Sequence, residues 1–171
     1  EHHDTLGGQL TLTTGEPRLL RQLLLRTADP EYTLAIAAAM ETLSTHPYAR
    51  ALIGAVQSLG KSLPPLTDGR VEASAGIEAT VGGRRYRLGK LEFALIDKQA
   101  AQRGDVAAIA AREGLHAAST IVLADADGAV ALFVFGERLR DDAASLIDAV
   151  AERGVEPILI SGDRRAPVHA V

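Results

Sequence analysis

The residues best suited to chemistry are Glu41 and His46, which flank a break between two helical patterns. A carboxylate accepts hydrogen bonds and an imidazole can donate or accept them, so together they could bind a polar ligand. Each also has a simpler interpretation: His46 before Pro47 is typical of a loop between helices, and Glu41 of a solvated helix residue. The two residues alone leave both roles open.

Several common catalytic and metal-binding patterns are missing from the sequence. There is no Gly-x-x-x-x-Gly-Lys-Ser/Thr loop to hold phosphates, and there is no His-x-x-x-His pair and no cysteine to hold zinc. The lack of cysteine excludes disulfides and fits a reducing compartment. The opening Glu1-His2-His3-Asp4 could bind a metal, but it is more typical of a polar tail.

The composition describes a soluble globular domain with an aliphatic core. Of the 171 residues 47% are hydrophobic but only 4% aromatic, so alanine, leucine, isoleucine and valine must fill the interior. A net charge of -4 offers no basic surface for nucleic acid. The longest apolar runs, such as 129–135, are far shorter than the roughly 20 residues of a membrane span. We therefore expect no nucleic-acid partner and no direct membrane contact.

Two helices are expected to position Glu41 and His46. Asp29-Pro30 is a typical helix start, because aspartate caps free N–H groups and proline suits the first turn. The first helix is expected from about Glu31 to Leu43, and the second from Pro47 to Gly60, with apolar residues at helical spacing. This helical hairpin places Glu41 near the end of one helix and His46 just before the next.

A β-hairpin is expected next along the chain. Ile77, Ala79 and Val81 alternate with polar residues, and Gly82-Gly83 supplies a two-residue turn into the strand 84–88. If the two glycines form the whole turn, the opposed pairs are Thr80 with Arg85, Ala79 with Tyr86, Glu78 with Arg87, and Ile77 with Leu88.

The remaining patterns complete an α+β prediction. Residues 91–115 read as helical with an interruption near Gly104-Asp105, and strands 120–124 and 129–135 are joined by a turn at 125–128. A helix over 141–152 and a strand over 156–160 suggest part of an α/β unit. The expected fold is an antiparallel sheet flanked by helical hairpins, followed by a partial α/β unit.

Several segments resemble heavy-metal (type IB) P-type ATPases, in the order in which that family has them. In the nucleotide-binding domain of that family a Glu-to-His-Pro signature precedes a glycine-containing hairpin, and phosphorylation-domain motifs flank both. The matching segments are Leu12-Thr13-Thr14-Gly15-Glu16-Pro17, Glu41 to Pro47, Ala75 to Gly89, Glu137 to Ala143, and Gly154 to Asp163. Together they cover nearly the whole chain.

The resemblance implies that the chain binds ATP, which in the family phosphorylates an aspartate on the neighbouring domain, with Mg2+ acting in the intact pump. It implies an ATP site made by Glu41, His46, Ser74 and Gly76, with Glu41 accepting from the adenine amino group and His46 orienting the nucleotide. It also implies a phosphorylation-domain loop at Ser161, Gly162 and Asp163.

By the same resemblance, the partners are the rest of the phosphorylation domain and the membrane domain of a pump. The chain would then be a cytoplasmic domain of an integral membrane protein. The sequence Ser161-Gly162-Asp163-Arg164 favours the copper pumps. The expected domains are 1–17, a remnant of the phosphorylation-domain start or an unrelated tail, then 18–135 for nucleotide binding and 136–171 for a partial phosphorylation domain.

The sequence also departs from the family pattern. Gly7 stands where the phosphorylated aspartate belongs, Ser74 replaces a glycine, Lys90 replaces an asparagine and Ser161 a threonine. The family's Gly-Asp-Gly-x-Asn-Asp segment is missing. We therefore expect this chain alone to bind ATP without hydrolysing it. The alternative is a non-catalytic regulatory or interaction domain with the same fold; a stand-alone phosphatase ranks last, because no Asp-x-Asp follows an N-terminal strand.

Overall fold

The computed structural model describes residues 13–113, 115 and 119–139. Six strands form one antiparallel sheet in the order β1-β6-β5-β4-β3-β2. The strands are β1 (Thr13–Leu24), β2 (Leu66–Glu72), β3 (Gly76–Val81), β4 (Arg84–Gly89), β5 (Ser119–Asp125) and β6 (Gly128–Leu139). The helices are α1 (Pro30–Glu41), α2 (Pro47–Ser58), α3 (Leu91–Ala94), the short 3-10 helix η1 (Asp97–Gln99) and α4 (Ala100–Arg112). The α+β architecture expected from the sequence is confirmed.

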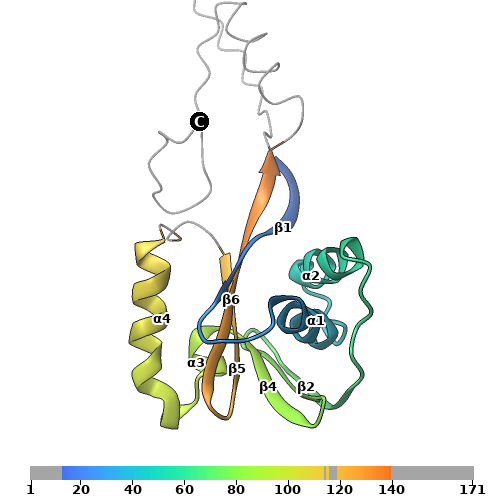
Figure 1. Cartoon of the computed structure of the whole chain (residues 1–171). Helices are drawn as coiled ribbons and strands as arrows, with labels where there is room; N and C mark the ends of the chain where they lie inside the picture. The colour runs from blue at the N-terminus through green and yellow to red at the C-terminus, as the bar shows by residue number, and fades with distance from the viewer. Residues whose placement is uncertain (1–12, 114, 116–118, 140–171) are drawn as a thin grey trace, which may run out of the picture.

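Helices cover both faces of the sheet, so the domain has three layers (Figure 1). The larger core lies between the sheet and the pair α1 and α2, and the smaller core lies under α3 and α4. Helix α1 is buried from Thr33 to Glu41 because it is packed between α2 and the sheet. Its alanine-rich sequence suits this place, since small side chains let helix and sheet approach closely.

Both predicted helix starts are confirmed. The Asp29 carboxylate accepts a hydrogen bond from the Tyr32 backbone N–H at 3.1 Å, and Pro30 occupies the first turn of α1. His46 and Pro47 begin α2 in the same way. Helix α1 ends at Glu41 rather than Leu43, so Glu41 is its last residue.

The predicted β3–β4 hairpin is confirmed in every pair. Gly82 and Gly83 have φ of 57° and 76°, the left-handed conformation that a two-residue turn needs. Glu78 lies opposite Arg87, and their side chains form an ion pair with an Nε to Oε2 distance of 2.6 Å. Burial alternates along β3, with Ile77, Ala79 and Val81 facing the larger core.

The helical region after β4 is interrupted at a different place from the one predicted. Gly104 and Asp105 lie inside α4, and the break runs instead from Leu95 to Gln99. Leu95 adopts an extended backbone and is fully buried in the smaller core, which stops α3. Arg103 then donates from Nε to the freed Leu95 carbonyl at 2.9 Å. The packing of Leu95 outweighs the weak helix propensity of Gly104.

Strands β1 and β2 were not predicted from the sequence. β2 is an edge strand with almost all residues exposed, so it has no alternation of apolar and polar residues. β1 is the opposite edge and pairs with β6, with Pro17 opposite Glu137 and Arg18 opposite Gly136. The domain boundaries predicted after residues 17 and 135 therefore fall within the paired strands β1 and β6.

The Asp125 side chain, at the β5–β6 turn, links the segment before α1 to the start of β4. This side chain is completely buried and forms ion pairs with Arg26, before α1, and with Arg84, at the start of β4. The backbone N–H of Asp127 donates to Asp125 Oδ1 at 2.9 Å. Gln99 donates to the Asp125 backbone carbonyl at 2.8 Å. From the sequence, Asp125 was predicted only as part of a turn.

The charges around Asp125 control its ionisation. Burial by itself raises the pKa of the Asp125 carboxyl, but hydrogen bonds from Arg26 and the Asp127 backbone and the positive charges of Arg26 and Arg84 outweigh it. The pKa of Asp125 is therefore below its ordinary value. Asp125 is a charged anchor that holds the β5–β6 turn.

Neither a membrane span nor a metal cluster is found in the described part of the chain. None of its helices has both the length and the apolar character that crossing a bilayer requires. Its histidine and acidic residues form no group of three or more that could hold a metal ion.

Candidate functional site

Glu41 ends α1 with a buried carboxylate. The residue is 6% exposed, and within the described residues its Oε2 atom has no hydrogen-bond partner. Burial raises the pKa of the Glu41 carboxyl above its ordinary value, and a hydrogen bond with Ser44 opposes the shift only in part. Since nearly all buried polar atoms in proteins are hydrogen-bonded, a free acceptor here requires an explanation. A ligand that donates a hydrogen bond would supply the missing partner.

His46 is the N-cap of α2 and is exposed. Its backbone N–H donates to Ser44 Oγ at 2.9 Å, and its Nδ1 atom accepts from the Tyr48 backbone N–H at 3.3 Å. In a neutral imidazole with Nδ1 as acceptor, the proton is on Nε2. His46 therefore offers a ligand a hydrogen-bond donor, whereas Glu41 offers an acceptor.

Tyr48 links His46 to the core. Its ring lies 4.3 Å from the His46 ring and is stacked on Phe135 of β6, with 4.1 Å between centroids and an 11° angle between planes. These rings border a pocket of about 290 Å³ lined by Pro17, His46, Pro47, Tyr48, Ser119, Phe135, Gly136 and Glu137. The sequence analysis did not identify Tyr48 as a site residue. Its position directly after His46-Pro47 was the signal that could have found it.

Ser74 lies in the tight turn between β2 and β3. It is exposed and has a φ of 62°, a conformation that glycine adopts most easily. The turn is closed by a hydrogen bond from the Ala75 N–H to the Glu72 carbonyl at 3.1 Å. The position that the resembled family fills with glycine therefore keeps a glycine-like backbone although serine occupies it.

Gly76 is the first residue of β3, and there is no space beside it for a side chain. A Cβ atom there would lie 2.3 Å from the Leu88 carbonyl oxygen and 2.5 Å from the Phe93 ring. Internal packing alone therefore explains the glycine. The role of Gly76 in approaching a nucleotide remains a proposal.

We expect Gly76→Ala to lower the free energy of unfolding by about 1–3 kcal/mol, since the Leu88 carbonyl belongs to the paired strand and cannot easily move. Gly54→Ala is the matched control, because a Cβ atom at Gly54 in α2 meets nothing within 4 Å. It should raise stability by about 0.5–1 kcal/mol. Urea denaturation measures both, and equal effects would show that the close packing at Gly76 is relieved without cost.

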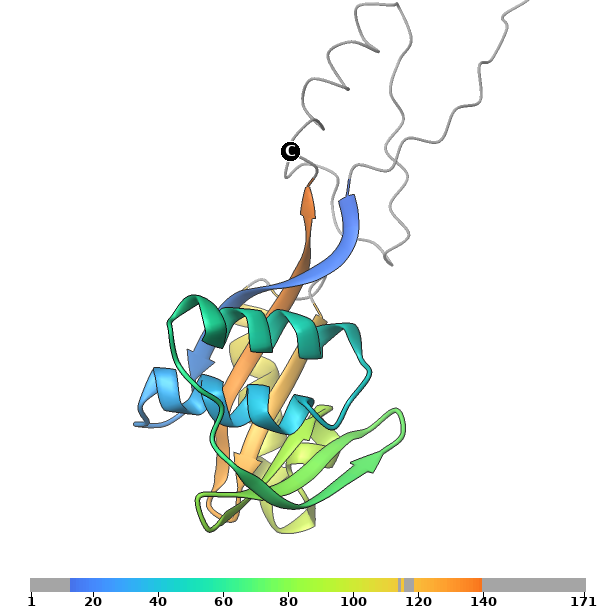
Figure 2. The same ribbon diagram turned by 90° about the vertical axis from the view of Figure 1, so that its right-hand side faces the viewer.

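The α1–α2 connection, which carries His46, and the β2–β3 turn, which carries Ser74, lie on the same side of the molecule (Figure 2). Near the start of α1, the Tyr32 hydroxyl lies 2.8 Å from a Cβ position at Gly82, in the turn that ends β3. The first turn of α1 thus lies beside the β3–β4 turn. Figure 2 shows the α1–α2 connection and the β2–β3 turn on the same side of the molecule. The structure thus brings Glu41 and His46 into one connection that faces the turn with Ser74.

Three arginines of β4 could in principle form a phosphate-binding patch, but each is engaged by a carboxylate. Arg84 forms ion pairs with Asp125 and Asp127. Arg85 and Arg87 both bind Glu78, each at 2.6 Å. Each of the three is already paired with a carboxylate, although Arg85 and Arg87 share the single charge of Glu78. This pairing favours the adenosine end as the part of a nucleotide that is bound. Ser161, Gly162 and Asp163, and also Gly7, lie outside the described residues.

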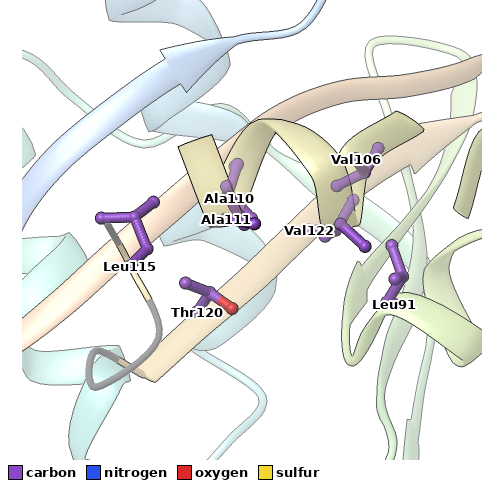
Figure 3. A pocket seen from close by; sticks show the side chains of 9 residues that line it. Leu91, Val106, Ala110, Ala111, Leu115, Thr120 and Val122 are labelled. Carbon is purple, nitrogen blue, oxygen red and sulfur yellow. The ribbon is translucent and has the colours of Figure 1, made fainter. Parts of the chain in front are cut away.

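A second pocket, of about 270 Å³, lies between α4 and the sheet (Figure 3). Its lining contains one polar side chain, Thr120, and no predicted site residue: Leu91, Val106, Ala107, Ala110, Ala111, Leu115, Thr120, Val122 and Leu132. It offers little for recognition of a polar ligand, so we place the candidate site at the α1–α2 connection.

Comparison with known proteins agrees with this architecture. Residues 11–171 match the family described as "Hydrolase: haloacid dehalogenase-like hydrolase". The chain belongs to this family. It is also 31% identical over 163 residues to a copper-exporting P-type ATPase of Bacillus subtilis (strain 168). That match covers 94% of the chain but 20% of the relative, so the chain spans about a fifth of the relative's length.

Solved structures of similar fold include P-type ATPases. A zinc-transporting PIB-type ATPase in an E2.Pi state matches with a TM-score of 0.70 and 26% identity, over 85% of this chain and 23% of that one. The N-domain of a copper-transporting P-type ATPase matches in fold, with a TM-score of 0.55 and 22% identity, over 68% of this chain and 97% of that domain. The resemblance to heavy-metal P-type ATPases, expected from the sequence, is confirmed.

Proposed function

We propose that this chain is the ATP-binding cytoplasmic portion of a heavy-metal P-type ATPase, with copper as the transported metal. The observation that carries the proposal is the buried Glu41 carboxylate, whose Oε2 lacks a partner among the described residues. Adenine carries an amino group that can donate to this oxygen. The His46 Nε2–H can donate to an acceptor on the same ligand. The similarity to copper-exporting and zinc-transporting P-type ATPases supports the wider assignment.

In this proposal the chain holds and orients the nucleotide and does not cleave it. Glu41 and His46 fix the adenine end, while Ser74 and Gly76 provide backbone close to the ligand. Phosphoryl transfer depends mainly on positioning and electrostatics, and in a pump the acceptor aspartate and Mg2+ would act at the phosphorylation domain. Ser161, Gly162 and Asp163 would belong to that domain. The proposed division is residues 18–135 for nucleotide binding and 136–171 for part of the phosphorylation domain.

The proposed partners are the remainder of the phosphorylation domain and the membrane domain of the pump. The chain would then lie on the cytoplasmic side of an integral membrane protein. The metal would be cargo bound elsewhere.

Titration calorimetry with ATP, ADP, AMP and GTP, each with and without Mg2+, tests this function. If the adenosine end dominates, the first three should bind within about tenfold of each other, roughly 1.4 kcal/mol. GTP should bind more weakly, because it presents a carbonyl to Glu41 where adenine presents an amino donor. Mg2+ should have little effect.

His46→Asn tests the proposed imidazole contact and should weaken ATP binding about tenfold, roughly 1.4 kcal/mol. Asparagine is a good N-cap, so it keeps the start of α2 while removing the imidazole donor. A steep, Mg2+-dependent preference for ATP over AMP would move the main contacts to the phosphates. Failure to bind any adenine nucleotide would instead favour a regulatory or interaction domain.

A further inference from the structure

We infer that Tyr48 is a positioning residue, which holds the His46 imidazole in one orientation and one tautomer so that Nε2–H is presented to the nucleotide. The inference rests on the proposed function, since it assigns a ligand contact to His46. Tyr48 itself acts through His46.

The first support is the backbone around the imidazole. The Tyr48 N–H donates to His46 Nδ1 at 3.3 Å, which occupies the lone pair on that nitrogen. The His46 N–H is held by Ser44 Oγ at 2.9 Å. These two contacts fix the backbone of His46 and select the Nε2–H tautomer, but they do not hold the ring from the side.

The second support is the stack of three rings. Tyr48 lies between His46 and Phe135, at centroid distances of 4.3 and 4.1 Å. Phe135 is 1% exposed and belongs to the larger core, so the lower end of the stack is rigid. The ring planes of His46 and Tyr48 are inclined by 57°, a tilted arrangement that aromatic pairs favour. An exposed imidazole is thereby connected to a core residue through one side chain.

The consequence is chemical. A histidine at a helix start can rotate about its side-chain bonds and exchange its proton between two nitrogens. Here the Tyr48 N–H holds Nδ1 and the Tyr48 ring supports the imidazole, so Nε2–H is the available donor. A preoriented donor binds its ligand with less loss of side-chain freedom than a mobile one. Removal of the Tyr48 ring should therefore weaken nucleotide binding through its effect on His46.

The experiment compares Tyr48→Leu with Tyr48→Phe, using ATP titration on folded protein well below the melting temperature. Tyr48→Leu should weaken binding about five- to tenfold, the size typical of coupling between residues in contact. Tyr48→Phe keeps the ring and should bind within about twofold of wild type. In the His46→Asn background Tyr48→Leu should cause no further loss. Equal losses in both backgrounds, or no loss in either, would overturn the inference.

A second readout uses nitrogen-15 NMR of the His46 ring in nucleotide-free protein. Wild type, Tyr48→Phe and Tyr48→Leu all keep the backbone N–H of residue 48, so each should show the Nε2–H tautomer when the imidazole is neutral. Tyr48→Leu should differ by increased motion of the imidazole ring in nitrogen-15 relaxation, because the supporting ring is lost. Imidazole motion in Tyr48→Leu equal to that of wild type would overturn the inference. If wild type does not bind ATP, the proposed function fails, yet this measurement still decides whether Tyr48 positions His46.

Discussion

Replacing Asp125 with alanine is expected to lower the free energy of unfolding by about 2–3 kcal/mol. Breaking a buried ion pair by removing one partner costs about 3–5 kcal/mol when a buried charge remains. Here the remaining charges belong to Arg26 and Arg84, whose side chains are 32% and 45% exposed, so water relieves part of the cost. The Asp127 N–H also loses its acceptor. Urea denaturation at neutral pH measures the loss.

The matched control is Asp127→Ala. Asp127 also pairs with Arg84, but its side chain is 71% exposed. An exposed ion pair contributes less than about 1 kcal/mol, so this variant should remain close to wild type. If the two variants lose equal stability, burial of Asp125 is not what makes its ion pairs important.

Asp125→Ala should also alter how the free energy of unfolding depends on pH. The folded-state pKa of Asp125 lies below its ordinary value, near 4 for an unfolded aspartate. The contribution of Asp125 is therefore present above about pH 4 and is lost as the pH falls through the lower folded-state pKa. Asp125→Ala should lack this part of the acid-induced loss, and an acid titration of stability that matches wild type would contradict the role of its charge.

The sequence predicted those parts of the fold that depend on patterns among neighbouring residues. The β3–β4 hairpin was predicted to the register because alternation and Gly82-Gly83 act over neighbouring residues. Asp29-Pro30 and His46-Pro47 marked the helix starts for the same reason. Strand β2 gave no such signal, because an exposed edge strand buries neither face. The break at Leu95 depends on tertiary packing, which short-range patterns do not contain.

The candidate site was predictable to a similar extent. The spacing of Glu41 and His46 placed both at one helical connection. That Oε2 of Glu41 would be buried without a partner depends on the packing of α1 between α2 and the sheet. The contact of Tyr48 with Phe135 joins residues far apart in the chain, and the same is true of Asp125 with Arg26. Residues that act through distant contacts were therefore missed, whereas residues in a local pattern were found.

Replacing Glu41 with methionine is expected to stabilise the nucleotide-free domain and to weaken nucleotide binding. A buried polar atom without a partner costs about 1–3 kcal/mol, so an unbranched apolar side chain should raise the free energy of unfolding by about 1–2 kcal/mol. The same change removes the proposed acceptor for the adenine amino group. ATP should bind about tenfold or more weakly, roughly 1.4 kcal/mol, and the preference for ATP over GTP should disappear. Denaturation and calorimetry measure the two effects.

The control on the same helix is Glu31→Met. Glu31 is exposed and pairs with Lys61 at 2.8 Å, also on the surface. Loss of a surface pair and of an acidic residue in the first turn should lower stability by less than about 1 kcal/mol. It should leave nucleotide affinity unchanged. A site role for Glu41 requires that the two variants change stability in opposite directions.

The pH dependence distinguishes the site role further. Burial raises the folded-state pKa of Glu41, so ionisation of its carboxyl opposes folding. The contribution of Glu41 to the free energy of unfolding is therefore fully present below about pH 4.3 and is lost as the pH rises through the folded-state pKa. Binding has the reverse sign, because only the ionised carboxylate offers both oxygens as acceptors. Adenosine, which has no phosphate that titrates in this range, should bind more tightly as the pH rises. Glu41→Met should abolish that increase. A methionine variant that is less stable than wild type and binds adenosine equally well would show Glu41 to be structural.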